Sequence, residues 1–101
     1  MHLVLCNCPP AEALLLARVL VEERLAACVN VLPGVTSVYQ WKGELCEDSE
    51  HTLLIKVSSE KRDALTARLA VLHSYDVPEI LVLDPNIAAS FDGYVAWVRS
   101  V

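Results

Sequence analysis

Basic residues are scarce in this sequence, and long apolar segments are absent. Lysine and arginine together number 8 against 13 aspartates and glutamates, so the formal net charge is −5. Nucleic-acid affinity comes largely from clustered lysine and arginine, and the longest basic run here is Lys61-Arg62. No segment approaches the roughly 20 apolar residues of a transmembrane helix. We therefore expect neither nucleic acid nor a membrane as a partner.

The first residues also lack the features of a secretory signal. The segment 1–7 has no basic region before its apolar residues and turns polar too soon for a signal peptide. We therefore expect a cytoplasmic protein with reduced thiols, in which neither a disulfide nor a metal is needed for folding. The four thiols are Cys6, Cys8, Cys28 and Cys46.

The sequence contains no common catalytic motif. G-x-S-x-G, the P-loop and G-x-G-x-x-G are all absent, which removes the usual support for serine hydrolysis and for nucleotide-binding folds. His2, His51 and His73 do not show the i, i+4 spacing with each other that marks a zinc-binding helix. The sequence therefore gives no support for these classes of chemistry.

Apolar residues nevertheless make up 54% of the chain, enough to build a core. The continuous apolar run at 3–6 is typical of a strand buried on both faces. A second strand is expected from residue 27 to 41, with a bend at Pro33-Gly34. Lys42-Gly43 is a plausible tight turn into a return strand that ends at 53–57. A short last strand is expected at 80–83.

Three helices are predicted between and after these strands. The first follows Pro9-Pro10, and the second is capped by Ser58 or Ser59. The third is capped by Ser90. The apolar positions that indicate their buried faces are Ala13, Leu16, Ala17, Leu20 and Val21 in the first, Leu65, Leu69 and Leu72 in the second, and Phe91, Tyr94, Val95 and Val98 in the third.

The order of these elements predicts one α+β domain over residues 1–101. Right-handed crossovers around a βαββαβ set give a four-stranded antiparallel sheet with both crossover helices on one face. The remaining helix at the C-terminus is additional to this plan.

The predicted hairpin is longer than its own domain. From Ala27 to Lys42 an extended strand reaches ~50 Å at ~3.3 Å per residue. A domain of this size has a diameter of roughly 35 Å. Tyr39 and Trp41 near the tip are unfavourable to leave in water, so we expect a neighbouring subunit to cover them. The alternative is a hairpin that folds back over its own sheet.

Two cysteines at the end of the first strand form a candidate metal site. Cys6 and Cys8 point the same way in an extended chain, and two thiolates in that arrangement could hold Cu(I). The alternative is that Cys6 packs as a small apolar residue. Because we expect neighbouring antiparallel strands to end on opposite sides, Cys6 and His73 should act in separate sites or meet only across a subunit boundary.

The segment 73–79, between a predicted helix and a strand, concentrates polar and aromatic side chains. His73 is either part of a site or a favourable cation at a helix C-terminus. Asp76 and Glu79 could be an acid and base pair, although no nucleophile lies near them in the sequence. Lys56 is either a partner for Glu79 or an edge residue whose ammonium extends to solvent.

Several segments together resemble the CutA divalent-cation tolerance family. They are residues 22–30 (EERLAACVN), 33–37 (PGVTS), 39–43 (YQWKG), 73–80 (HSYDVPEI) and 94–97 (YVAW). The resemblance implies a ferredoxin-like fold, a homotrimer whose long hairpins wrap neighbouring subunits, and a likeness to PII signalling proteins. It also implies tolerance to copper and other divalent metal ions, and it implies no reaction, so we expect a protein that is not an enzyme.

The resemblance assigns metal roles to particular positions. Cys6 matches the family's metal-linked cysteine and His73 matches its histidine, with Cys8 as a further candidate. Two positions depart from the family pattern: Leu72 stands where some members have a second histidine, and Pro10 where an aspartate is usual. The alternative function is that of a PII-like module that binds a small anionic metabolite in a cleft between subunits, beside Lys56, Tyr75, Glu79 and Trp41.

Overall fold

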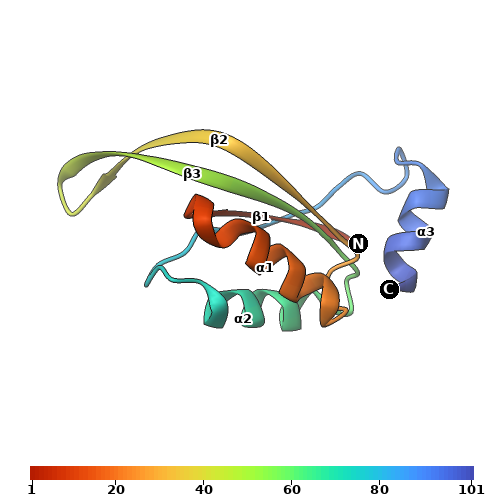
Figure 1. Ribbon diagram of the computed structural model, residues 1–101. Coiled ribbons are helices and arrows are strands. Elements are labelled where there is room, and N and C mark those ends of the chain that lie inside the picture. Colours follow the sequence, from red (N-terminus) through yellow and green to blue (C-terminus); the bar gives the residue numbers. More distant parts are fainter.

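The chain folds as an α+β sandwich in which two helices cover one face of a four-stranded antiparallel sheet (Figure 1). This computed structural model describes all 101 residues. The elements are β1 (His2–Cys8), α1 (Pro10–Glu22), β2 (Cys28–Trp41), β3 (Glu44–Val57), α2 (Arg62–Leu72), β4 (Ile80–Leu83) and α3 (Asp92–Ser100). The strand order is β2-β3-β1-β4. The predicted ferredoxin-like plan with an extra C-terminal helix is therefore confirmed.

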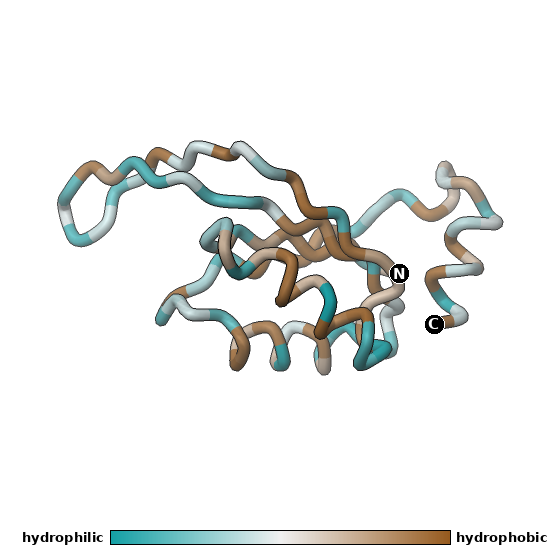
Figure 2. Tube along the Cα trace, in the orientation of Figure 1, coloured by the Kyte–Doolittle hydropathy of each residue, from teal (hydrophilic) through white to brown (hydrophobic).

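The core lies between the sheet and the helices α1 and α2. Along β1, Val4, Cys6 and Cys8 are buried, whereas the alternate residues are partly exposed. Our expectation that this strand is buried on both faces is therefore wrong for the single chain, where only the helix side is fully covered. Figure 2 shows apolar residues gathered in the central strands and along α1. None of the three helices has the length and hydropathy of a transmembrane span.

The hairpin of β2 and β3 projects beyond the helices (Figure 1). Its strands pair as far as Trp41 and Glu44, and Lys42 and Gly43 both have positive φ angles, of 51° and 81°, as a type I′ turn requires. The predicted bend appears as a register shift between Leu32 and Val35. The molecule measures 44 Å in its longest direction against 28 Å and 22 Å in the others. The alternative in which the hairpin folds back is therefore wrong.

The predicted serine caps are also wrong, because those hydroxyls are used elsewhere. Helix α2 follows Lys61 and α3 follows Phe91, and neither helix has a side-chain cap. Ser59 Oγ lies 3.3 Å from His2 Nδ1, and Ser90 Oγ donates to the Asn86 carbonyl at 2.6 Å. Local spacing correctly predicted that helices follow, but it missed the distant partner of Ser59 and the loop partner of Ser90.

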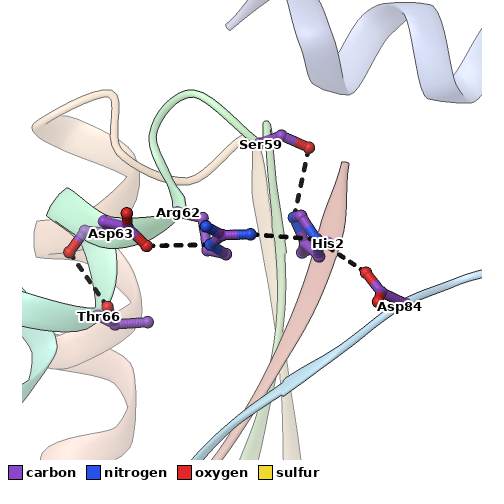
Figure 3. Close-up of polar contacts among 6 residues, drawn as sticks. All are labelled: His2, Ser59, Arg62, Asp63, Thr66 and Asp84. Atoms are coloured by element: carbon purple, nitrogen blue, oxygen red, sulfur yellow. Dashed lines mark hydrogen bonds and ion pairs between the residues drawn. The ribbon is translucent and has the colours of Figure 1, made fainter.

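His2, which the sequence left without a role, joins three elements (Figure 3). Its Nε2 donates to Asp84 Oδ1 at 2.8 Å, while its Nδ1 faces the Ser59 hydroxyl. The Arg62 guanidinium at the start of α2 lies 3.4 Å from the same Nε2. The first residue of β1 is thus held beside the segment after β4 and the start of α2.

Helix α1 ends in a Schellman motif that carries an arginine where glycine is preferred. The Leu25 amide donates to the Leu20 carbonyl and the Arg24 amide to the Val21 carbonyl, both at 3.0 Å. Arg24 has a φ of 59°, in the left-handed region that a Cβ disfavours.

We expect Arg24→Gly to be more stable than Arg24→Ala by about 1 kcal/mol, because only alanine keeps the Cβ that opposes this conformation. Chemical denaturation of both variants measures the difference. Equal stabilities would show that the left-handed conformation at Arg24 carries no strain.

Candidate functional site

The end of β1 and the loop before β4 lie side by side in one chain. The two strands are antiparallel and Cys6 pairs with Ile80, so the last residues of β1 neighbour the residues that precede β4. His73 Nε2 lies 2.8 Å from the Asn7 carbonyl oxygen. The premise that neighbouring antiparallel strands end on opposite sides is therefore wrong for these two segments, whereas separate sites for Cys6 and His73 stay a prediction. In antiparallel neighbours, the C-terminus of one strand adjoins the N-terminus of the other.

His73 is buried, and both of its ring nitrogens form hydrogen bonds. Nε2–H donates to the Asn7 carbonyl, and Nδ1 accepts from the Tyr75 amide at 3.1 Å. This pattern assigns the neutral Nε2–H tautomer and not the helix-terminal cation considered above. The imidazole fixes the loop between α2 and β4 to β1, and it has no lone pair free for a metal while both bonds persist.

Cys6 and Cys8 point to the same side of β1, as the spacing predicted, and both are fully buried. Burial raises the pKa of the Cys6 thiol from 9.0 to about 12 and that of Cys8 to about 11. Both are therefore protonated at neutral pH. No group of three or more histidine, cysteine, aspartate or glutamate side chains is arranged to hold a metal ion. The proposed copper ligands do not form a ready site in the single chain.

An open cleft of about 690 Å³ lies between the hairpin and the loop before β4. It is lined by Asn7, Ser37, Val38, Tyr39, Trp41, Glu50, Ser74, Tyr75, Asp76, Val77 and Glu79. Three of the four residues expected in a ligand cleft, Trp41, Tyr75 and Glu79, thus lie together. The fourth, Lys56, does not line the cleft.

Lys56 lies at the opposite end of β3, where it pairs with Leu3 and Cys28 across the sheet. Its ammonium contacts Asn30 Oδ1 and lies 3.9 Å from Cys28 Sγ. Of the two alternatives for Lys56, the pairing with Glu79 is therefore wrong, because β3 places Lys56 far from the loop before β4.

The cleft has two phenols that act as hydrogen-bond donors to carboxylates. Tyr75 Oη donates to Glu50 Oε2 at 2.9 Å, and Tyr39 Oη donates to Asp48. Burial and the Glu50 carboxylate raise the pKa of Tyr75. The hydrogen bond to Asp48 raises the pKa of Tyr39 to about 12. Both phenols therefore stay protonated at neutral pH and orient the carboxylates that face them.

Glu50 is the functional candidate that sequence reasoning missed. The buried positions of β3 run through the odd residues 53, 55 and 57, but the next buried residue is Glu50. The change of phase occurs opposite the bulge between Leu32 and Val35. Bulges increase local twist, so the side of the strand that is covered changes there. The adjacency of Pro33 and Gly34 was the only signal for this change.

Comparison with known proteins gives a consistent result. A sequence model of the CutA1 divalent ion tolerance protein family matches residues 2–101. A divalent-cation tolerance protein CutA from Thermus thermophilus is 47% identical over 99 residues, covering 97% of this chain and 94% of that protein. The human protein CutA is 46% identical over 86 residues, which cover 85% of this chain but 47% of the human protein.

Solved structures agree with the sequence comparison. A PII-like protein CutA from Nostoc, in apo form, superimposes with a TM-score of 0.95 and is 42% identical. The match covers 99% of this chain and 95% of that chain. Similarity therefore extends over the whole fold, including the hairpin and the loop that form the cleft.

We expect the free energy of unfolding to fall as pH rises from 9 toward 11, because unfolded thiols lose protons that folded Cys6 and Cys8 retain. The unfolded state then binds fewer protons, which gives a slope of up to ~1.4 kcal/mol per pH unit for each thiol. Denaturant titrations across this interval measure it. Cys6→Ala should flatten the slope, whereas Cys46→Ala, on the projecting hairpin, should not. A Cys6→Ala slope equal to that of the parent would contradict the burial effect.

Proposed function

Because this chain belongs to the CutA1 divalent ion tolerance family, we propose that it acts in the tolerance of divalent metal ions as a cytoplasmic homotrimer that catalyses no reaction. The observation that carries this proposal is the projecting hairpin, which matches the family's fold over its full length. The number of three subunits rests on the family resemblance. That another subunit covers this chain is inferred from its exposed apolar surface.

The single chain leaves much apolar surface uncovered. Only 18 of 101 residues are buried, a small core for a domain of this size. On the hairpin, Val38, Trp41 and Leu45 are 62%, 47% and 75% exposed. The sheet also ends in two unpaired edges, β2 and β4, and Leu81 and Val82 of β4 are exposed. Exposed apolar edges promote association unless another chain covers them, which supports assembly.

Copper is the metal that we propose for this protein, with Cys6, Cys8 and His73 as the contacts. Cu(I) prefers thiolate ligands and also accepts imidazole. The two thiols share one side of β1, and His73 bonds to Asn7 between them. Because the thiols are protonated and both imidazole nitrogens are occupied, binding requires proton release and loss of a His73 hydrogen bond. Cu(I) affinity should therefore increase with pH.

A second candidate function is the binding of a small molecule in the cleft. The observation that favours it is the volume of about 690 Å³, within the range of ~300–1,000 Å³ that ligand pockets occupy. This function does not exclude metal tolerance, since neither Cys6 nor Cys8 lines the cleft.

We predict that light scattering after size exclusion will give three times the chain mass of 11.1 kDa at all workable concentrations. Trp41→Ala should weaken the trimer without unfolding the subunit, because Trp41 belongs to the hairpin tip, which projects from its own subunit toward a neighbour. Val71→Ala, an exposed apolar residue on α2, is the control and should leave the mass unchanged. A monomeric parent at micromolar concentration would refute the assembly.

We predict that Cys6→Ser removes most high-affinity Cu(I) binding, that Cys8→Ser removes some, and that His73→Ala affects mainly Cu(II). Titration against a competing chelator measures each affinity. Cys46→Ser should bind as the parent does, because this thiol lies on the hairpin away from β1. If Cys6→Ser also binds Cu(I) like the parent, the Cys6 thiol only packs in the core.

A further inference from the structure

The cleft contains negative charge and aromatic rings but no basic side chain. Three of its lining residues are carboxylates, Glu50, Asp76 and Glu79, and none is lysine or arginine. An anionic metabolite would therefore meet like charge without a compensating donor. A bare metal ion also fits poorly, because the volume is large and no three ligating groups converge. The cleft favours an organic cation.

Glu50 gives this cleft an uncompensated charge. Glu50 is only 7% exposed, and its carboxylate accepts one hydrogen bond, from the Tyr75 hydroxyl to Oε2. The ion pairs of the chain all involve other residues. No buried side-chain polar atom lacks a partner, so the second oxygen of Glu50 must keep contact with the solvent of the cleft that it lines. A carboxylate this buried is stabilised when a cation approaches it.

The aromatic residues supply the second half of a cation site. Trp41 and Tyr39 come from the hairpin and Tyr75 from the opposite loop, and each is partly exposed. The face of an indole attracts an ammonium group within about 6 Å of its centre. Lys42 Nζ already lies 5.9 Å from the centre of the Trp41 ring. An ammonium group of the chain itself therefore already lies within the distance of a cation–π contact with this ring.

We propose that this cleft binds an organic ammonium ion, with the charge facing Glu50 and Glu79 and the alkyl groups against Trp41 and the tyrosines. The proposal deepens the second candidate function and rests on it only for the location of the ligand. It replaces the anionic ligand first expected for a PII-like module. Assembly and copper binding do not depend on it.

The experiment uses the Trp97→Phe protein in its native assembly, which leaves Trp41 as the only tryptophan of the chain. Choline is the probe, and dimethylbutanol, its uncharged isostere with carbon in place of nitrogen, is the matched control. We expect choline to change Trp41 fluorescence in a saturable manner and the alcohol to bind about tenfold more weakly or not at all, since only charge distinguishes them.

Charge-neutral variants then locate the cation. Glu50→Gln should weaken choline binding about tenfold, and Glu79→Gln, which is exposed and does not threaten folding, should weaken it severalfold. Glu60→Gln removes the same charge outside the cleft and should change nothing. Lys42→Gln should leave binding unchanged or tighter, because it removes the ammonium near Trp41.

Three outcomes would overturn the proposal. Equal binding of choline and dimethylbutanol would show an apolar groove without charge selectivity. Equal weakening by Glu60→Gln and Glu50→Gln would show general attraction to an acidic surface. Absence of any choline response would show that no cation enters, as when a neighbouring subunit fills the cleft. Scattering mass and the copper titration remain separate readouts, so none of these results alters the family function.

Discussion

The arrangement depends most on β1, which pairs on both sides and lies in the interior of the sheet. It pairs antiparallel with β3 of the hairpin on one edge and with β4 on the other. Val4, Cys6 and Cys8 are buried toward α1 and α2, so the strand also contributes side chains to the core. Two strands therefore pair with β1 directly, and the core that α1 and α2 cover lies against it.

The candidate site follows from this pairing. The C-terminal end of β1 lies between His51 and Thr52 of β3 on one side and the loop before β4 on the other. Asn7 bonds to both neighbours: its carbonyl accepts from His73 at 2.8 Å, and its Oδ1 accepts from the Thr52 hydroxyl at 2.6 Å. The cleft is therefore built from segments far apart in the sequence that meet because one strand ends there.

Apolar periodicity and turn residues were sufficient to predict the element order, because burial of one face sets the spacing of each helix and strand. The projection of the hairpin followed from length alone. The roles of Ser59 and His2 could not be predicted, since each depends on a partner brought close by tertiary structure. Ser90 instead bonds to the Asn86 carbonyl in its own loop. Glu50 was missed for a similar reason: the bulge changes which side of β3 is covered, and alternation cannot reveal where that occurs.

The two ligand chemistries considered for this protein share a structural element. Asn7 lines the cleft, while its carbonyl holds the imidazole of His73 beside the thiols of β1. Recruitment of His73 by a metal breaks a hydrogen bond to Asn7 or to the Tyr75 amide, and Tyr75 is the residue that orients Glu50. Two ligands that act on the same hydrogen-bonded residues are thermodynamically linked, and each changes the affinity of the other by the same factor. In this fold, a metal at β1 and a cation in the cleft therefore cannot be independent if the metal takes His73.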